Sequence, residues 1–361
     1  MNTDIRQPLR VLPERVYRVY RGGRLLDAYR GVEPAADGAF PEDWVASDTR
    51  AVNPGREHMH EGLSRVVLPG GQTALLRDLI TAQPEAMLGA AHVARWGAQA
   101  AVLVKLLDAA ERLPVHWHPG RDFIARHRGG WFGKTECWLI RETRVLDGEP
   151  SIYLGLRQGV TVEQFKGWVR AQDAERLPGA LNRLKVSPGD VYVIPAGLPH
   201  AIGAGVMMIE VQEPSDWSIH AEYAPFGLGE DEAHQGFGWE AAFEALDAVA
   251  CTPEDIRQRL KQETPVVRQV GDSVERRLIA PEYAGYFGAS EATVRGALPL
   301  EGGRLAIGLV DAGEGRVEAG GGALSLARGT TFVLPAAASD ARLVSSGGDA
   351  LRVTLCYPPA A

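Results

Sequence analysis

The sequence of 361 residues predicts a mainly β protein, an antiparallel barrel or sandwich for which a jelly roll is the natural candidate. Short apolar runs recur between turns rich in glycine and proline, of which the chain has 42 and 23. The two halves also share one rhythm: a small-residue turn, a β-branched strand, a Pro-Ala pair and another strand. It occurs in SPGDVYVIPAGLPHAI and again in ARGTTFVLPAAASDARL. Helical spacing is confined to residues 73–110 and 238–262, so helices are a minor part of the predicted fold.

The individual elements follow from local patterns along the chain. Residues 15–31 are predicted to form two short strands around Gly22-Gly23, and residues 64–80 a strand, a turn and a helix that starts near Thr73. The dense apolar run AAVLVKLLDA predicts a buried strand. The pair Thr252-Pro253, followed by two acidic residues, is a helix-start pattern. Further strands are predicted in SIYLGLRQG, LKVSPGDVYVIPAGLPHAIGAG, VMMIEVQEP and RLAIGLVDAGEGRVEAGGGALSLARGTTFVLPA.

Composition excludes several classes of partner and site. The formal charge of −8 is spread without a basic run, which argues against nucleic acid and against an anionic membrane surface. No apolar run approaches the roughly 18 residues of a membrane span, and the N-terminus lacks the apolar segment of a secretory signal. The three cysteines, Cys137, Cys251 and Cys356, are too far apart in the sequence to indicate a disulfide framework or a thiolate zinc site. We therefore expect a cytoplasmic protein.

The stretch PVHWHPGRD, residues 114–122, carries the first candidate site. In a strand, residues two apart share a face, so His116 and His118 project together while Trp117 points away. Two neutral imidazoles suit one shared cation, such as zinc, iron, nickel or copper. The alternative is a pair of buried histidines that are only hydrogen-bonded, as barrel histidines often are.

Two further segments strengthen the metal interpretation. Glu136, in GKTECW, is flanked by apolar residues, and a buried carboxylate needs a cation or a proton. An exposed glutamate with Thr135 and Cys137 facing inward is the alternative. His200 follows a rigid turn between two prolines, at the start of a new strand. If these segments are neighbouring strands of one barrel, three histidines and a glutamate converge and can hold a divalent ion with positions open to substrate.

Several motifs together resemble type I phosphomannose isomerases, members of the cupin superfamily. They are LRDLITAQPEAMLGA, AAVLVKLLDAAERLPVHWHP, GKTECW, KVSPGDVYVIPAGLPHAIGAG and VMMIEVQEPSD, and the resemblance covers roughly residues 15–225. It implies two cupin (jelly-roll) barrels, with a small helical segment around 73–110 inserted in or packed on the first. The implied units are a catalytic, metal-binding cupin at 1–237, a helical bridge at 238–264, and a smaller metal-free cupin at 265–361.

The resemblance implies a zinc site formed by His116, His118, Glu136 and His200. The family usually has glutamine where His116 stands, a change that shifts the ligand set towards nitrogen. Iron, manganese and nickel are therefore alternatives to zinc. A place for His116 just outside the metal's ligands is the alternative to direct coordination.

The implied activity is that of a metal-dependent aldose–ketose isomerase of carbohydrate metabolism, interconverting mannose 6-phosphate and fructose 6-phosphate through an enediol. Lys134 would bind a substrate oxygen or phosphate, or else be a solvated rim lysine. Glu210 would carry out acid/base work, or else be a strand glutamate paired with a cation. His220 stands where the family carries an arginine; it could shuttle a proton but cannot grip phosphate bidentately.

That replacement leaves alternatives open. An unphosphorylated or differently substituted sugar is a rival substrate, and a non-catalytic sugar-binding cupin is a rival function. An oxygen-using metal enzyme is a third alternative, which follows from the extra histidine, since three histidines and one glutamate also suit iron in cupins. The expected partner is a small-molecule sugar or sugar phosphate, and the chain is expected to be a monomer or a homodimer. A second H-x-H pattern at 58–60 lies between turn residues and is interpreted as a loop.

Overall fold

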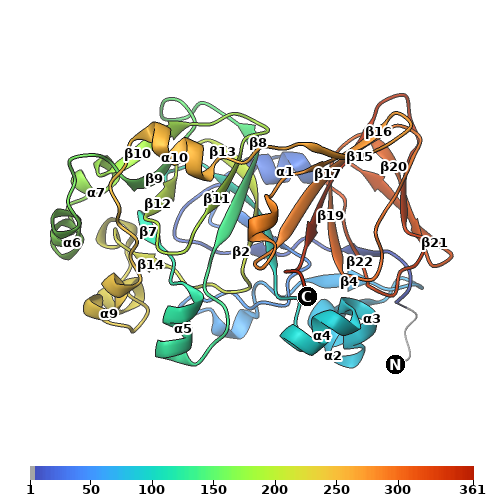
Figure 1. Ribbon diagram of the computed structural model, residues 1–361, viewed down its shortest axis with the longest axis horizontal. Helices are drawn as coiled ribbons and strands as arrows, with labels where there is room; N and C mark the ends of the chain where they lie inside the picture. The colour runs from blue at the N-terminus through green and yellow to red at the C-terminus, as the bar shows by residue number, and fades with distance from the viewer. Residues whose placement is uncertain (1–4) are drawn as a thin grey trace.

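The chain folds as four antiparallel β-sheets that pack face to face, one against the next, with helices around them (Figure 1). The computed structural model describes residues 5–361. Within that range, no helix combines the length and the hydropathy that crossing a bilayer requires.

Two of the sheets lie in the half that contains the predicted site. The five-stranded sheet has the order β10 (Leu181–Lys185), β9 (Ser151–Leu156), β12 (His200–Ile202), β7 (His116–Trp117), β14 (Ile219–His220). The six-stranded sheet has the order β11 (Val191–Ile194), β8 (Glu136–Thr143), β13 (Val206–Gln212), β6 (Leu103–Ala109), β3 (Glu42–Val45), β2 (Arg15–Val16).

The other two sheets lie mainly in the C-terminal part of the sequence. The nine-stranded sheet has the order β15 (Val266–Val270), β16 (Ser273–Arg277), β17 (Gly288–Val294), β24 (Leu351–Tyr357), β19 (Ala306–Ala312), β22 (Thr331–Leu334), β1 (Leu9–Val11), β4 (Arg65–Val67), β5 (Thr73–Leu75). The four-stranded sheet has the order β18 (Ala297–Pro299), β23 (Arg342–Ser345), β20 (Glu314–Ala319), β21 (Gly322–Ala327).

Three successive apolar cores hold the four sheets together. One core lies between the five- and six-stranded sheets, one between the six- and nine-stranded sheets, and one between the nine- and four-stranded sheets. Strand β6 shows why its sequence is mostly apolar: Leu106 belongs to the core towards the nine-stranded sheet and Leu107 to the core towards the five-stranded sheet. A strand covered on both faces must be apolar on both, which confirms the predicted buried strand.

Helices are more widespread than the sequence analysis predicted. The helices are α1 (Arg24–Arg30), α2 (Leu76–Ala82), α3 (Pro84–Leu88), α4 (Ala90–Trp96), α5 (Arg121–Arg128), α6 (Val162–Ala171), α7 (Arg176–Gly179), α8 (Glu230–Ala233), α9 (Trp239–Glu244) and α10 (Pro253–Leu260). Short 3₁₀ helices are η1 (Glu57–Met59), η2 (Ala224–Phe226) and η3 (Pro281–Tyr283). The predicted confinement of helices to 73–110 and 238–262 was therefore wrong.

Two of the missed helices have a local cause. Helix α1 replaces the second strand predicted after Gly22-Gly23; it starts directly after Gly23 and buries Leu26 and Tyr29, three residues apart on one face. Helix α6 starts with a capping box in which Thr161 and Gln164 satisfy each other's backbone donors, a sequence pattern that was present but not used. The helix-start pattern at Thr252 was interpreted correctly, because its side chain caps α10 in the same way.

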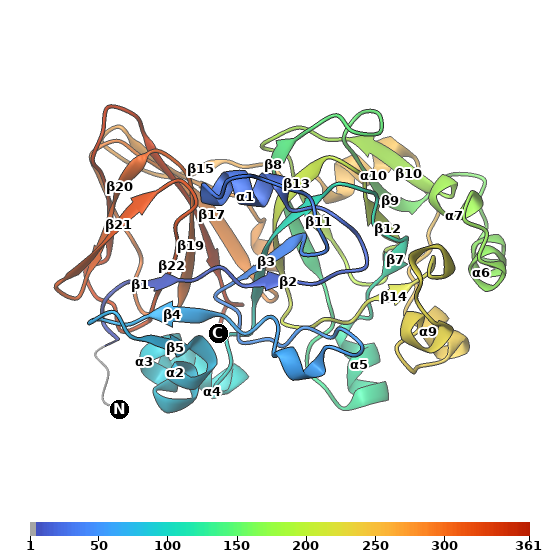
Figure 2. The ribbon, with the colours of Figure 1, turned by 180° about the vertical axis from the view of Figure 1, so that it is seen from behind.

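Three N-terminal strands belong to the sheet of the C-terminal part. Strand β1 pairs with β22 and with β4, and β4 pairs with β5, so these strands extend the nine-stranded sheet (Figure 2). Helix α3 also reaches this side, because the carbonyls of Ala86 and Met87 accept hydrogen bonds from Ala337 and Ala336. The helical segment that follows β5 therefore contacts the C-terminal part of the chain.

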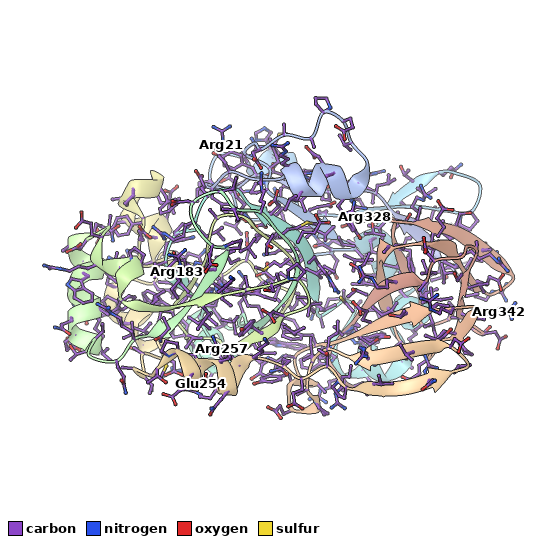
Figure 3. All side chains as sticks on the ribbon, turned by 90° about the horizontal axis from the view of Figure 1, so that it is seen from above. Arg21, Arg183, Glu254, Arg257, Arg328 and Arg342 are labelled. Atoms are coloured by element: carbon purple, nitrogen blue, oxygen red, sulfur yellow. The ribbon has the colours of Figure 1, made fainter. Side chains whose placement is uncertain are left out.

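Ion pairs add to the apolar contact between the halves. Arg141, on β8, lies 3.1 Å from Glu291 on β17 and 3.5 Å from Asp311 on β19, and it also hydrogen-bonds Thr354. Nearby, Arg328 pairs with Glu142 and donates to the carbonyl of Ala28 at the end of α1. Figure 3 labels Arg328 among the side chains of the whole molecule.

Replacing Arg141 with methionine should lower the free energy of unfolding by about 3 kcal/mol, because two largely buried carboxylates lose their cation. Urea denaturation measures the loss. The control is Arg295→Met, since Arg295 is exposed in the C-terminal half and its side chain forms no ion pair with the described residues. A midpoint for Arg141→Met equal to that of the control would contradict the expected role of this arginine.

Candidate metal centre

A cavity of about 560 Å³ opens between the five- and six-stranded sheets. It contains five of the seven residues singled out in the sequence. The five are His116, Lys134, Glu136, Glu210 and His220. The other two, His118 and His200, are fully buried directly beneath the end of the cavity that His116 and Glu136 line, which we call its floor, and both contact Glu136.

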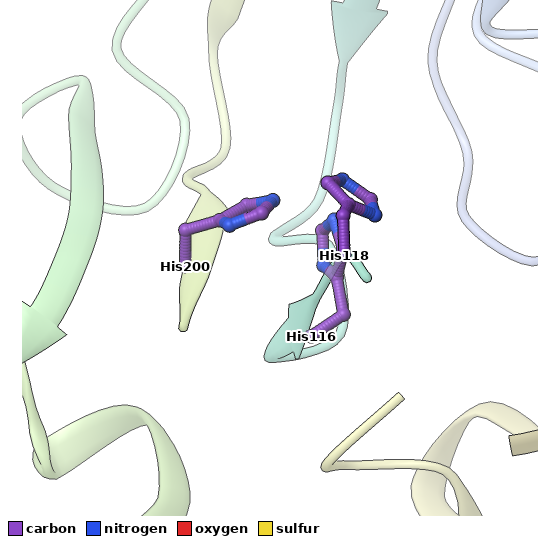
Figure 4. Close-up of side chains that lie close together, drawn as sticks. All are labelled: His116, His118 and His200. Atoms are coloured by element: carbon purple, nitrogen blue, oxygen red, sulfur yellow. The ribbon is translucent and has the colours of Figure 1, made fainter. Parts of the chain in front are cut away.

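Three imidazoles converge at the floor of the cavity (Figure 4). His116 on β7 is the register partner of His200 on β12, and His118 follows directly after the end of β7. One nitrogen from each of the three rings lies within 4.8 Å of the others. Trp117 points the opposite way, into the apolar layer under α6 and α9, as the two-residue period of a strand requires.

Backbone carbonyls fix how each imidazole is oriented. In His116, Nδ1 lies 2.8 Å from the carbonyl oxygen of Pro114. In His118, Nδ1 lies 2.7 Å from the carbonyl oxygen of Trp217, and in His200 it lies 2.7 Å from that of Leu198. A carbonyl oxygen only accepts hydrogen bonds, so each Nδ1 carries the proton and each Nε2 keeps a free lone pair. This is the arrangement that metal-binding histidines adopt.

Glu136 reaches the imidazoles from the other sheet. It stands at the start of β8, and its two carboxylate oxygens lie 3.2 Å from Nε2 of His118 and 3.4 Å from Nε2 of His200. Trp138 Nε1 donates to it at 2.9 Å. The expectation that all the segments would be neighbouring strands was thus only partly right, because β7 and β12 are paired whereas β8 faces them.

The electrostatics of the cluster fit a divalent cation. Burial lowers the pKa of all three imidazoles below their usual range, so the rings are neutral and can offer lone pairs to a metal ion. Burial acts to raise the pKa of Glu136, but the Lys134 ammonium opposes it, and the pKa lies below its usual value, so the carboxyl is ionised. Nε2 of His118 and His200 and Oε2 of Glu136 are buried without any hydrogen-bond partner. Unpaired buried polar atoms are costly, and a shared cation would satisfy these three together.

Glu210 and two lysines stand beside the cluster on the same face of the six-stranded sheet. Glu210 on β13 is the register partner of both Trp138 on β8 and Lys105 on β6. Lys105 Nζ lies 3.0 Å from Glu210 Oε2, while Lys134 Nζ lies 3.5 Å from Glu136 Oε2. Burial, together with the charge of Glu136, raises the pKa of Glu210 to about 7. Glu210 is thus paired with a cation, and its raised pKa is also compatible with the acid/base role that stays a prediction.

His220 lies at the cavity wall on β14, where it is the register partner of His116. The two rings are 5.9 Å apart between centroids. Burial and the Lys134 charge lower the pKa of His220 to about 4, so the ring is neutral, and its buried Nδ1 has no hydrogen-bond partner. It is therefore free to hydrogen-bond a molecule in the cavity.

Sequence reasoning missed six charged residues of the cavity: Arg18, Glu42, Arg50, Lys105, Asp216 and Glu232. Lys105 could have been found, since a lysine in the otherwise apolar run AAVLVKLLDA requires a partner. Arg18 and Glu42 gave no such signal, because the segments that carry them reach the site only through contacts with residues far away in the sequence. The H-x-H pattern at 58–60 is exposed around η1 and lies outside the histidine cluster.

Comparison with known proteins identifies relatives of one kind. No family model matches the chain. Over 237 residues, it is 31% identical to the "Probable mannose-6-phosphate isomerase GmuF" of Bacillus subtilis, an alignment that covers 65% of this chain and 69% of the relative. It is 36% identical to the mannose-6-phosphate isomerase ManA of the same organism over 115 residues, 32% of this chain and 34% of ManA.

Solved structures show the same fold. The crystal structure of the mannose 6-phosphate isomerase from Bacillus subtilis superposes with a TM-score of 0.72 at 20% identity, covering 97% of this chain and 99% of that one. A mutant of phosphomannose isomerase from Salmonella typhimurium gives 0.71 at 17% identity, with 98% and 100% covered. Together with the identity and coverage shared with GmuF, this shows that the chain belongs to the mannose-6-phosphate isomerase family.

Proposed function

We propose that the protein is a metal-dependent aldose–ketose isomerase that interconverts mannose 6-phosphate and fructose 6-phosphate. One observation carries the proposal: buried ligand atoms of His118, His200 and Glu136 face one another without hydrogen-bond partners, directly beside Glu210 in a cavity. The names of the relatives agree with this chemistry. A cavity of about 560 Å³ is also ample for one sugar phosphate.

Four residues would hold the metal: His116, His118, Glu136 and His200. Zinc is the proposed ion, and nitrogen-rich ligands also suit iron, manganese or nickel. When bound, such an ion stabilises the negative charge that develops on the substrate oxygens as an enediol forms. The backbone carbonyls that hold each Nδ1 keep the imidazoles oriented for this role.

Glu210 is the proposed acid/base group. Isomerisation requires a group that removes a proton from the carbon next to the carbonyl and returns it to the neighbouring carbon. A carboxyl with a pKa of about 7 can do both near neutral pH, because neither of its forms is strongly disfavoured. Lys105, 3.0 Å away, supports the ionised form of this side chain.

Lys134 and His220 would orient the sugar. The Lys134 side chain is buried at the cavity wall, which supports a hydrogen bond to a substrate oxygen over a solvated role at the rim. The unpartnered Nδ1 of His220 can bind a sugar hydroxyl or pass a proton to it.

We also propose that the two pairs of sheets are two cupin barrels. The units would be a catalytic one at 1–237, a helical bridge at 238–264 and a metal-free one at 265–361, with β1, β4 and β5 joining the last. The separate apolar core within each pair supports this division, as does the lack of histidine after residue 234 in the sequence. The proposed compartment is the cytoplasm, supported by three free, buried cysteine thiols. The protein would act there as a monomer or a homodimer.

Removing the metal should abolish isomerisation, and replacing it should restore activity. We expect about one divalent ion per chain by elemental analysis, and conversion of mannose 6-phosphate to fructose 6-phosphate that stops after chelation. His200→Ala should weaken metal binding more than about 100-fold, since it removes a direct ligand. The control is His58→Ala, because His58 is exposed and outside the cluster. Full activity in the chelated protein would refute the proposal.

Glu210→Gln should retain the metal but lose catalysis. We expect kcat to fall by about 100- to 10,000-fold, because the amide cannot carry the proton. Deuterium exchange from heavy water into the substrate should fall in parallel, whereas Glu163→Gln on the exposed face of α6 should be neutral. If exchange survived in Glu210→Gln and vanished in His220→Asn, the proton would be carried by His220 instead.

The raised pKa of Glu210 should also appear in the stability of the metal-free protein. The folded carboxyl keeps its proton up to about pH 7, whereas the ordinary pKa is 4.5. The stability it contributes is therefore complete below about pH 4.5 and is lost as the pH rises through about 7. Urea midpoints of the metal-free wild type should fall relative to those of Glu210→Gln between about pH 5 and pH 8. Parallel curves would show that Glu210 has an ordinary pKa.

A further inference from the structure

Three of the four cations that line the cavity already face carboxylates. Arg18, Lys105 and Lys134 are the three, and the partners lie 3.0 to 3.5 Å away. The contacts are Arg18 with Glu42 at 3.0 Å and Asp216 at 3.1 Å, Lys105 with Glu210 at 3.0 Å, and Lys134 with Glu136 at 3.5 Å. The positive charge of the buried part of the cavity is thus largely compensated.

Arg50 is the fourth cation and differs from the others. It lines the cavity but is exposed, so it lies at the mouth. It interacts electrostatically with the exposed Glu57, yet its side chain forms no hydrogen bond or ion pair with any residue from 5 to 361. Its guanidinium is therefore available to an anion that enters from solvent.

The backbone on both sides of Arg50 is firmly held. Thr49 N donates to Ser47 Oγ at 3.0 Å, and Ala51 N donates to the carbonyl of Glu61 at 2.9 Å. Val52 N donates at 2.8 Å to Asp216, the carboxylate that also pairs with Arg18. The loop therefore presents Arg50 from a fixed platform, and such preorganisation favours binding.

The position of Arg50 matches the position expected for the charged end of the substrate. This step rests on the proposed function, which puts the reacting carbons at the histidine cluster on the cavity floor. The phosphate is at the opposite end of the sugar's carbon chain and would therefore point towards the mouth. No arginine is available at 220, and the segment after it, APFGLGEDEAHQG, contains no lysine or arginine.

We propose that Arg50 binds the phosphate group of the substrate and is the residue that sets specificity for phosphorylated over neutral sugars. A guanidinium matches phosphate oxygens with paired hydrogen bonds. One other charged group lines the cavity, Glu232, whose carboxylate is held by the backbone N–H of Gly229 at 2.7 Å.

The test compares wild type, Arg50→Gln, Arg50→Lys and the exposed control Arg295→Gln. Calorimetry measures binding of glucitol 6-phosphate, which cannot isomerise, and of glucitol, which lacks the phosphate. Arg50→Gln should weaken binding of glucitol 6-phosphate by about 10- to 100-fold and leave glucitol binding unchanged. The affinity of Arg50→Lys for glucitol 6-phosphate should lie between those of Arg50→Gln and the wild type. In turnover of mannose 6-phosphate, Arg50→Gln should raise KM with kcat within about twofold of wild type.

Equal binding of glucitol 6-phosphate by wild type and Arg50→Gln, including no detectable binding by either, would overturn the proposal. An equal loss for glucitol and its phosphate would also overturn it, because the arginine would then support the cavity rather than the phosphate. Absence of isomerisation in the wild type would instead refute the proposed function. The binding measurement would still decide the role of Arg50 in that case.

Discussion

The structure depends on charged side chains that stand on the inner face of a buried sheet. Lys105, Glu136 and Glu210 lie on three adjacent strands, and none is more than 3% exposed. Charges removed from water require partners, or they destabilise the fold. Lys105 pairs with Glu210, but one carboxylate oxygen of Glu136 accepts no hydrogen bond. The sheet that faces these residues presents imidazoles to Glu136, and because their Nε2 atoms carry lone pairs rather than protons, they complement the carboxylate only through a shared cation.

The site is consequently a product of how two sheets stack. The imidazoles come from the five-stranded sheet and the carboxylates from the six-stranded sheet, and an apolar core between the two sheets fixes their separation. Trp138 and Leu154 are part of that core. On its other face the six-stranded sheet packs against the nine-stranded sheet, with strands from the N-terminus completing the contact. Packing far from the cavity thus holds the ligand atoms in place.

Local patterns in the sequence located the parts of the site that local structure determines. The opposite directions of His116 and Trp117 follow from the period of a strand, and the end of the Pro-Ala-Gly-Leu-Pro turn places His200 at a strand start. Whether β8 pairs with β7 or faces it is set by long-range register, which no local pattern encodes. The same reason hides Glu42, whose strand enters the site by pairing with β6, far away in the sequence. Helix α1 was missed because seven residues are too few for periodicity to separate helix from strand.

Arg18 illustrates how such long-range contacts build the cavity wall. Its Nε lies 3.0 Å from Glu42, its Nη1 donates to Asn53 at 3.0 Å, and its Nη2 lies 3.1 Å from Asp216. One guanidinium thereby joins three segments that are remote in the sequence. An arginine whose nitrogens are all engaged by the protein cannot release them to grip a phosphate without leaving buried carboxylates unpaired. The Arg18 guanidinium therefore does not replace the arginine that the family carries at the position of His220. An anion in the cavity must instead be bound by a cation whose hydrogen-bond donors are free.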